Sequence, residues 1–106
     1  MSDDASVWAI LGKRWTLPIL KIAGSAEPVR FCQIKKSLAG ISNTVLSGRL
    51  FELEQEGLVA RNVHGSKVEY SLTVSGRELE FMLAKLERWW RVHRTTYQSV
   101  VAVSVE

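Results

Sequence analysis

The stretch RFCQIKKSLAGISNTVLSGRLFELEQEGL, residues 30–58, contains two helical patterns separated by a tight turn. Apolar residues recur at helical spacing in each pattern: Phe31, Ile34 and Leu38 in the first, and Leu46, Leu50 and Leu53 in the second. Gly40 suits the turn because glycine tolerates positive φ, and Ser42 is a good N-cap for the helix that follows. The stretch therefore predicts a helix-turn-helix motif over about residues 30–57.

Charge is unevenly distributed along the second helix of this motif. The segment from Ser42 to Arg49 has no acid and one base, whereas Glu52, Glu54 and Glu56 lie in the C-terminal half. The helix dipole disfavours acids at a C-terminus, and an N-terminal half that approaches phosphates must exclude carboxylates. This half is therefore predicted to enter a DNA groove, and the alternative is an ordinary solvated acidic face.

The polar side chains of this half are the candidate DNA contacts. They are Ser42 at the N-cap, followed by Asn43, Thr44, Ser47 and Arg49. Asparagine pairs well with adenine and arginine with guanine, while serine and threonine are less selective. A phosphate contact is the alternative for Arg49.

The first helix of a helix-turn-helix motif crosses the DNA backbone. Arg30 and Gln33 on that helix are therefore predicted to make positioning contacts, which carry no sequence information. Lys36 lies off the apolar face, where a phosphate contact and an ordinary solvated lysine are equally consistent with the pattern.

The segment after the motif predicts a β-hairpin. Residues 58–63 and 67–73 are two strand patterns, and the second alternates apolar and polar residues. The sequence HGSK, residues 64–67, forms the tip, where Gly65 supplies the turn. A hairpin placed directly after a helix-turn-helix is a wing, here over about residues 58–73, and Lys67 at its tip is a further candidate DNA contact.

Helical patterns also flank the motif and its wing. Thr16 is expected to cap an almost wholly apolar helix before the motif, which predicts that this helix is buried. A C-terminal helix is predicted over about residues 75–93, capped by Ser75 or by Thr73. The tail, residues 95–106, is rich in valine and threonine and is consistent with a strand, a frayed helix end or disorder.

A short helical pattern near the N-terminus, with Val7, Trp8 and Leu11 on its apolar face, accompanies the C-terminal helix. Together these two terminal helices carry more apolar surface than one wing and two short helices need to cover. Tryptophan is favoured at the centres of protein interfaces, and symmetric pairs are the commonest oligomers. A dimer interface is therefore favoured over a purely internal core for Val7, Trp8, Leu11, Met82, Leu83, Leu86, Trp89 and Trp90.

The composition of the chain limits its class. With 106 residues, 46% of them hydrophobic, the chain is expected to form a single domain over residues 1–106, and its net charge is only +3. The one cysteine, Cys32, cannot form an internal disulfide, which agrees with a reducing cytoplasm. There is no signal-peptide pattern and no apolar run near the ~20 residues that span a bilayer. Neither a catalytic set nor metal-ligand spacing occurs, so no enzyme activity, metal or cofactor is expected.

Four segments together resemble the HxlR-type winged helix-turn-helix transcription regulators: GKRWTLPIL, VRFCQIKKSLAGIS, LSGRLFELEQEGLVAR and VEYSLTVSGREL. They occur in the order and spacing of that family, over roughly residues 7–93. The resemblance implies a homodimeric DNA-binding regulator that pairs through its terminal helices. Many members carry a cysteine a few residues before the first helix, which some use as a redox or electrophile sensor, and many have a Pro-Pro step in the wing. This chain has neither.

The predicted fold is α+β and mainly α, a winged helix-turn-helix with a two-stranded wing and N- and C-terminal dimerisation helices. The expected partners are double-stranded DNA and a second copy of the chain, whose recognition helices enter successive major grooves. The alternatives are a protein-interaction module on the same scaffold and a redox or electrophile sensor that acts through Cys32. The operator, the regulated genes, the direction of regulation and any effector do not follow from the sequence.

Overall fold

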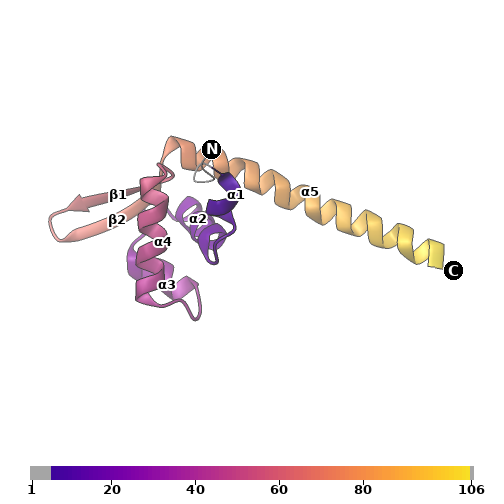
Figure 1. The fold of residues 1–106 in the computed structure, drawn as a ribbon, viewed down its shortest axis with the longest axis horizontal. Coiled ribbons are helices and arrows are strands. Elements are labelled where there is room, and N and C mark those ends of the chain that lie inside the picture. The colour runs from indigo at the N-terminus through magenta and orange to yellow at the C-terminus, as the bar shows by residue number, and fades with distance from the viewer. Residues whose placement is uncertain (1–5, 106) are drawn as a thin grey trace.

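The computed structural model describes residues 6–105, with side chains described to residue 96. Its elements are α1 (Val7–Leu11), α2 (Thr16–Ser25), α3 (Phe31–Ser37), α4 (Asn43–Gln55), β1 (Val59–His64), β2 (Lys67–Leu72) and α5 (Val74–Val105). Figure 1 shows a body of short helices, a hairpin that projects on one side and a long α5 that leaves on the other. The fold is the predicted winged helix-turn-helix.

The joint between α1 and α2 differs from the prediction. The N-cap of α1 is Ser6, whose hydroxyl accepts a hydrogen bond from the Trp8 N–H at 3.2 Å. Thr16 is not a cap but the first residue of α2, and it is buried. The preceding Trp15 turns the chain with a φ of 81°, a left-handed conformation that non-glycine residues seldom adopt.

The helix-turn-helix is organised as predicted. Gly40 has a φ of 92° in the turn between α3 and α4, which agrees with the freedom that glycine gives there. Lys35 donates from Nζ to the Ile41 carbonyl at 3.1 Å and closes the same turn. The Ser42 hydroxyl accepts from the Val45 N–H at 3.1 Å, which makes Ser42 the N-cap of α4. These local bonds set the angle at which α4 leaves α3.

The wing is an antiparallel pair that turns at Gly65, with Val59 opposite Leu72 and His64 opposite Lys67. The loop before α3 adds a single β-bridge to this pair. Val29 exchanges backbone hydrogen bonds of 2.9 and 2.7 Å with Tyr70, which attaches the loop before α3 to the base of the wing. The wing is therefore joined to the motif twice, through the chain between α4 and β1 and through these hydrogen bonds from β2.

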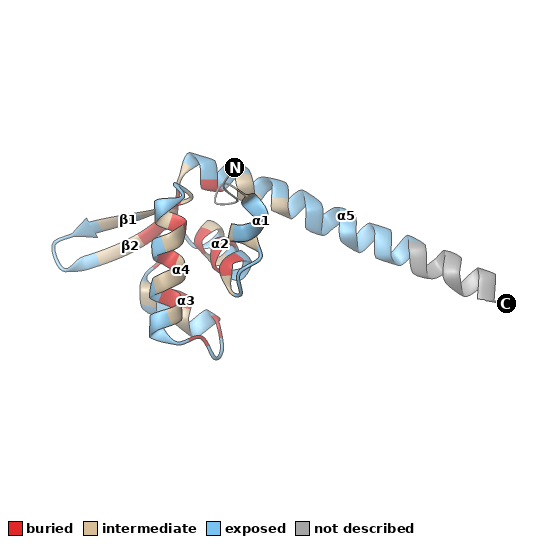
Figure 2. Cartoon of the chain, viewed as in Figure 1, coloured by how far each residue is buried: buried red, intermediate tan, exposed pale blue. Residues whose placement is uncertain are grey.

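The buried hydrophobic residues of the core lie where α2, α3, α4 and the base of the wing meet (Figure 2). They are Ile19, Leu20, Ala23, Val29, Ile34, Leu38, Ile41, Leu46, Leu50, Leu53, Val59, Tyr70 and Leu72. The three predicted inward leucines of α4 are 0–1% exposed. The core is thus completed by the helix-turn-helix and its wing.

The start of α5 packs closely on the wing. The Thr73 hydroxyl accepts from the Gly76 N–H at 3.0 Å, so Thr73 rather than Ser75 caps the helix. A Cβ at Gly76 would lie 2.1 Å from the Leu58 carbonyl oxygen, so only glycine permits this approach. Arg77 pairs with the Glu27 carboxylate and fixes the first turn to the loop before α3.

The C-terminal helix is much longer than predicted. It runs to Val105 rather than to about residue 93, so the backbone of residues 95–105 is helical. At 32 residues it is about 48 Å long. The radius of gyration is 17.1 Å, whereas a compact chain of this length has about 13 Å. The excess arises because much of α5 extends beyond the body.

Candidate nucleic-acid interface

The outward face of α4 is polar and free of acids at its start. Asn43, Thr44 and Ser47 are exposed, and no acidic residue lies in the first turn. Ser42 is also exposed, but its hydroxyl is engaged in capping. The first-turn N–H groups of a helix form its positive end, which favours a phosphate. The predicted reading end of α4 is therefore accessible on the structure.

Unlike Asn43, Thr44 and Ser47, Arg49 of α4 is engaged in contacts within its own chain. Its Nε donates to the backbone carbonyl of Arg14 at 3.0 Å, and its Nη1 lies 3.3 Å from the Glu52 carboxylate. Its side chain is only 24% exposed. The guanidinium thus fastens α4 to the joint between α1 and α2, and the structure separates it from the group formed by Asn43, Thr44 and Ser47.

Glu52, one of the three acids in the C-terminal half of α4, has a structural role. The Glu52 carboxylate lies 3.0 Å from Lys13 Nζ and also pairs with Arg49. Glu52 therefore pairs with two cations, Lys13 of the α1–α2 joint and Arg49 of α4. The charge gradient along α4 reflects this internal pairing as well as the exclusion of acids from the N-terminal half.

The candidate contacts at α3 differ in whether their polar groups already make hydrogen bonds within the chain. The Gln33 Oε1 atom accepts from the Arg30 N–H at 2.8 Å, so this side chain caps its own helix with its oxygen. The side chains of Arg30 and Lys36 are exposed. Lys36 has no ion pair within residues 6–96, which leaves its ammonium available to a phosphate.

The wing carries two exposed bases. Lys67 is more than half exposed at the tip and lies 3.4 Å from the Glu69 carboxylate, a long and screened pair. Arg61 on β1 is exposed, opposite Tyr70 in the register, and has no ion pair in the part whose side chains are described. Arg61 was not among the contacts predicted from the sequence, and its position as a base within a wing strand is the signal that points to it.

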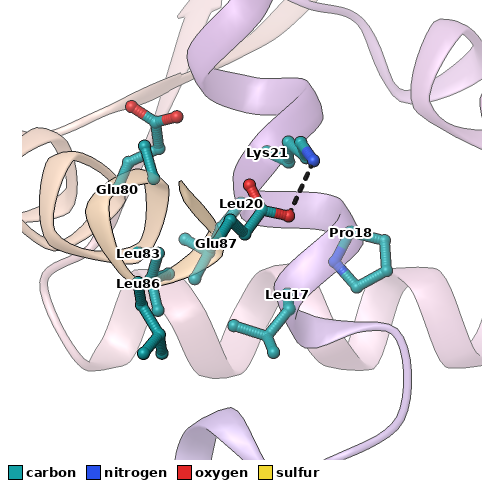
Figure 3. Close-up of a pocket in the computed structure, with 9 residues that line it drawn as sticks. Leu17, Pro18, Leu20, Lys21, Glu80, Leu83, Leu86 and Glu87 are labelled. Carbon is teal, nitrogen blue, oxygen red and sulfur yellow. Dashed lines mark hydrogen bonds and ion pairs between the residues drawn. The ribbon is translucent and has the colours of Figure 1, made fainter. Parts of the chain in front are cut away.

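The junction of α2 and α5 contains a groove of about 300 Å³ (Figure 3). Leu17, Leu20 and Leu83 line it, and Lys21 Nζ pairs with the Glu87 carboxylate across it at 2.9 Å. The apolar lining packs α5 against α2, and the exposed ion pair adds little to this contact. The position of α5 relative to α4 is therefore set within one chain.

The predicted dimer residues fall into two groups. Leu11 and Leu83 are half-buried and pack against the core of their own chain. The other six are exposed: Val7, Trp8, Met82, Leu86, Trp89 and Trp90. Trp8 is 74% exposed and Trp89 57%, values that are costly for so large an apolar surface in water. We refer below to Met82, Leu86, Trp89 and Trp90 as the α5 stripe.

Other kinds of site are not found in the described part of the chain. Residues 6–105 contain no group of three His, Cys, Asp or Glu side chains that could hold a metal ion. Within the same residues no helix is long and apolar enough to cross a membrane. Cys32 is a free, exposed cysteine on α3.

A polar recognition helix, a capping turn and a two-stranded wing define a DNA-binding transcription regulator of the winged helix-turn-helix class. A model of the HxlR-like helix-turn-helix family matches residues 10–98. The chain belongs to this HxlR-like helix-turn-helix family.

Relatives of similar length support this assignment. The uncharacterized HTH-type transcriptional regulator YvaP of Bacillus subtilis (strain 168) is 39% identical over 84 residues, covering 76% of each chain. The HTH-type transcriptional regulator YodB of the same organism is 36% identical over 87 residues, covering 79% of this chain and 77% of YodB.

Solved structures are similar in fold as well as in sequence. A possible HxlR family transcriptional factor from Thermoplasma volcanium GSS1 gives a TM-score of 0.74 at 33% identity, covering 87% of this chain and 84% of that one. The reduced form of YodB gives 0.72 at 36% identity, covering 79% and 84%. The redox regulator HypR in its oxidized form gives 0.70 at 30% identity, covering 80% and 90%.

Proposed function

We propose that this regulator acts as a homodimer that inserts its two α4 helices into successive major grooves of a pseudo-palindromic DNA site. The observation that carries the proposal is the acid-free, exposed first half of α4, opposite a leucine face that the core already covers. Such a helix has one face left for a partner, and its positive end favours the DNA backbone.

We assign base reading to Asn43, Thr44 and Ser47, because these side chains are exposed and have short polar ends. Positioning contacts to phosphates are proposed for the capping residue and for exposed side chains around α4: Ser42, Arg30, Gln33, Lys36, Lys67 and Arg61. Arg49 is proposed to hold α4 in place through the Arg14 carbonyl, with a phosphate contact left to its remaining N–H groups.

The dimer is proposed to form through α5 and α1. The α5 stripe lies on a helix whose far half has no body behind it (Figure 1), and Val7 and Trp8 of α1 are exposed as well. The groove between α2 and α5 shares Leu86 with this stripe and extends the apolar surface toward the body. A second copy would cover these side chains and determine the separation of the two α4 helices.

The deciding experiment is in-vitro selection of duplexes from a random pool with the full chain. We expect an enriched inverted repeat whose half-sites are spaced by about 10–10.5 base pairs, or a multiple, centre to centre. Light scattering at micromolar concentration should give twice the chain mass. A monomeric mass would refute the paired helices, and a failure to enrich any sequence at low salt would favour the protein-interaction module.

The proposed function also implies where the chain acts. A DNA-binding chain whose one cysteine cannot form an internal disulfide fits the reducing cytoplasm. No catalytic role, metal or cofactor is proposed for it.

Redox sensing through Cys32 is a second candidate, favoured by the exposure of its thiol at the start of α3. Reversible oxidation of an exposed thiol beside a DNA-contacting helix would interfere with binding. The test compares DNA binding before and after hydrogen peroxide, followed by a thiol reductant. Loss and recovery in the natural chain, but not in Cys32→Ser, would support sensing; binding that peroxide does not change would eliminate it.

A further inference from the structure

One aromatic side chain interrupts the polar outer face of α4. Phe51 is 60% exposed and lies just past the acid-free first half of α4, a helix whose inner face is fully buried. Thr44, Ser47 and Phe51 occur at i, i+3 and i+7, so they share one side of the helix. The charge pattern that supplies the other candidate contacts does not point to Phe51, because phenylalanine carries no charge.

The body of the chain does not cover this ring. Phe51 is absent from the core cluster and from the partly buried residues that pack on it. Within residues 6–96 it makes no ring–ring contact and lies under no cation. Phe51 lies on α4, the helix that the proposed function directs toward DNA, whereas the stripe of exposed apolar residues lies on α5. The ring is thus available to whatever α4 meets.

The helix surface beside Phe51 carries no side chain at Gly48. Gly48 lies one turn before it, and nothing lies within 4 Å of the position that a Cβ would occupy there. The helix backbone can therefore approach a partner closely at Gly48, with the phenyl ring of Phe51 extending further. Phe51 lies about 10 Å along the helix from Thr44, equivalent to about three base pairs of DNA.

The major groove offers one apolar group at its base edges, the C5-methyl group of thymine. The other atoms that distinguish the bases there are hydrogen-bond donors and acceptors, which a phenyl ring cannot satisfy. We propose that Phe51 packs against a thymine methyl group in each half-site, about three base pairs from the base that Thr44 contacts. This inference rests on the proposed entry of α4 into the major groove.

The test removes only that methyl group. Each thymine of the selected operator is replaced in turn by deoxyuridine, which keeps every hydrogen-bonding group, and the Kd is measured by fluorescence anisotropy at constant salt. One symmetric pair of replacements should weaken binding of the natural chain about 15-fold, or about fourfold for each buried methyl. Phe51→Ala should bind the thymine and deoxyuridine duplexes equally at that position.

Two controls separate this contact from other effects. Gln55→Ala changes an exposed residue one turn further along the same face and should keep the full thymine preference. Phe51→Leu should retain part of the preference because leucine is also apolar. The mass of Phe51→Ala in light scattering should equal that of the natural chain.

Each contrary result has a distinct meaning. If the natural chain binds the operator but no deoxyuridine replacement weakens it, the methyl contact is wrong while the proposed function stands. If Phe51→Ala is monomeric and the preference is unchanged, Phe51 belongs to a protein contact and the inference is overturned. If no operator can be selected at all, the proposed function fails and this inference fails with it.

Discussion

Helices α4 and α5 both present apolar side chains, but only one of them is complete within a single chain. Leu46, Leu50 and Leu53 of α4 are 0%, 1% and 1% exposed. On α5, Trp89 and Trp90 are 57% and 49% exposed, with no core behind them. A helix face that its own chain covers stabilises the fold, whereas a face left in water indicates a surface for a partner.

The difference has a geometric origin. The inner face of α4 packs in one core with residues of α2, α3 and the hairpin, and Arg49 fastens its side to the α1–α2 joint. The first half of α5 packs on the body, from Gly76 to the pair of Lys21 with Glu87. The remainder of α5 extends away from these contacts (Figure 1). Four predictions test whether this contrast governs stability and binding.

The largest effect is expected from replacing both tryptophans of α5 by glutamate, Trp89→Glu with Trp90→Glu. The charges would separate the two copies, and loss of the second half-site should weaken operator binding by about 10²- to 10⁴-fold. Light scattering and operator titration measure the two effects. Arg88→Ala is the matched control, because Arg88 is exposed on the side of α5 away from the stripe. A dimeric double variant would remove the interface from α5.

Leu50→Ala should destabilise the body of a single chain. Leu50 is 1% exposed, so the truncation leaves a cavity and should cost about 2–5 kcal/mol of the free energy of unfolding. Urea denaturation followed by circular dichroism measures this cost. Leu86→Ala is the comparison, measured in the Trp89→Glu, Trp90→Glu background, where the exposed Leu86 should contribute much less. Equal costs would end the contrast between the two helices.

Two substitutions should distinguish a base contact of α4 from a contact that holds α4 in place. Asn43→Ala should weaken operator binding by about 1–3 kcal/mol while leaving binding to random duplex almost unchanged, since it removes a base contact. Arg49→Ala should lower operator and random binding equally and reduce stability by about 1 kcal/mol, because it removes an internal hydrogen bond. Competition titrations with both duplexes decide the matter. Selective loss with Arg49→Ala would return that residue to the base-reading group.

The smallest effect is expected at the wing tip. Lys67→Ala should reduce affinity for all sequences and lower the log–log salt slope by about 0.9, the value for one phosphate contact. Glu69→Gln is an informative partner, since it releases Lys67 from its long ion pair and should strengthen binding slightly. Titrations at several salt concentrations measure both. A slope that Lys67→Ala does not change would place Lys67 off the DNA.

Much of the site could be predicted because it depends on local pattern. The spacing of Leu46, Leu50 and Leu53 defines the inner face of α4, and a short polar residue before that pattern defines its N-cap. The exposed residues Asn43 and Thr44 follow from the same periodicity. Phe51 was missed for a different reason, since an apolar residue near an apolar repeat gives no sign that it lies outside.

The tail of α5 shows the limit of composition. Valine and threonine favour strands, so the segment from Thr95 did not predict a helix. Helix formation has a costly first turn but adds one hydrogen bond for each later residue. A helix that starts at Val74 and is anchored to the body can therefore continue through β-branched residues to Val105.

The sequence by itself determined the helix-turn-helix, the wing and the polar, acid-free first half of α4, because periodicity, capping and turn residues act over a few neighbours. Tertiary structure alone decided the engagement of Arg49 and Glu52 with the α1–α2 joint, since those partners lie more than 30 residues away in the chain. It also decided which apolar residues of the terminal helices pack internally and which stay exposed. Burial depends on which elements meet, and a one-dimensional pattern does not contain that information.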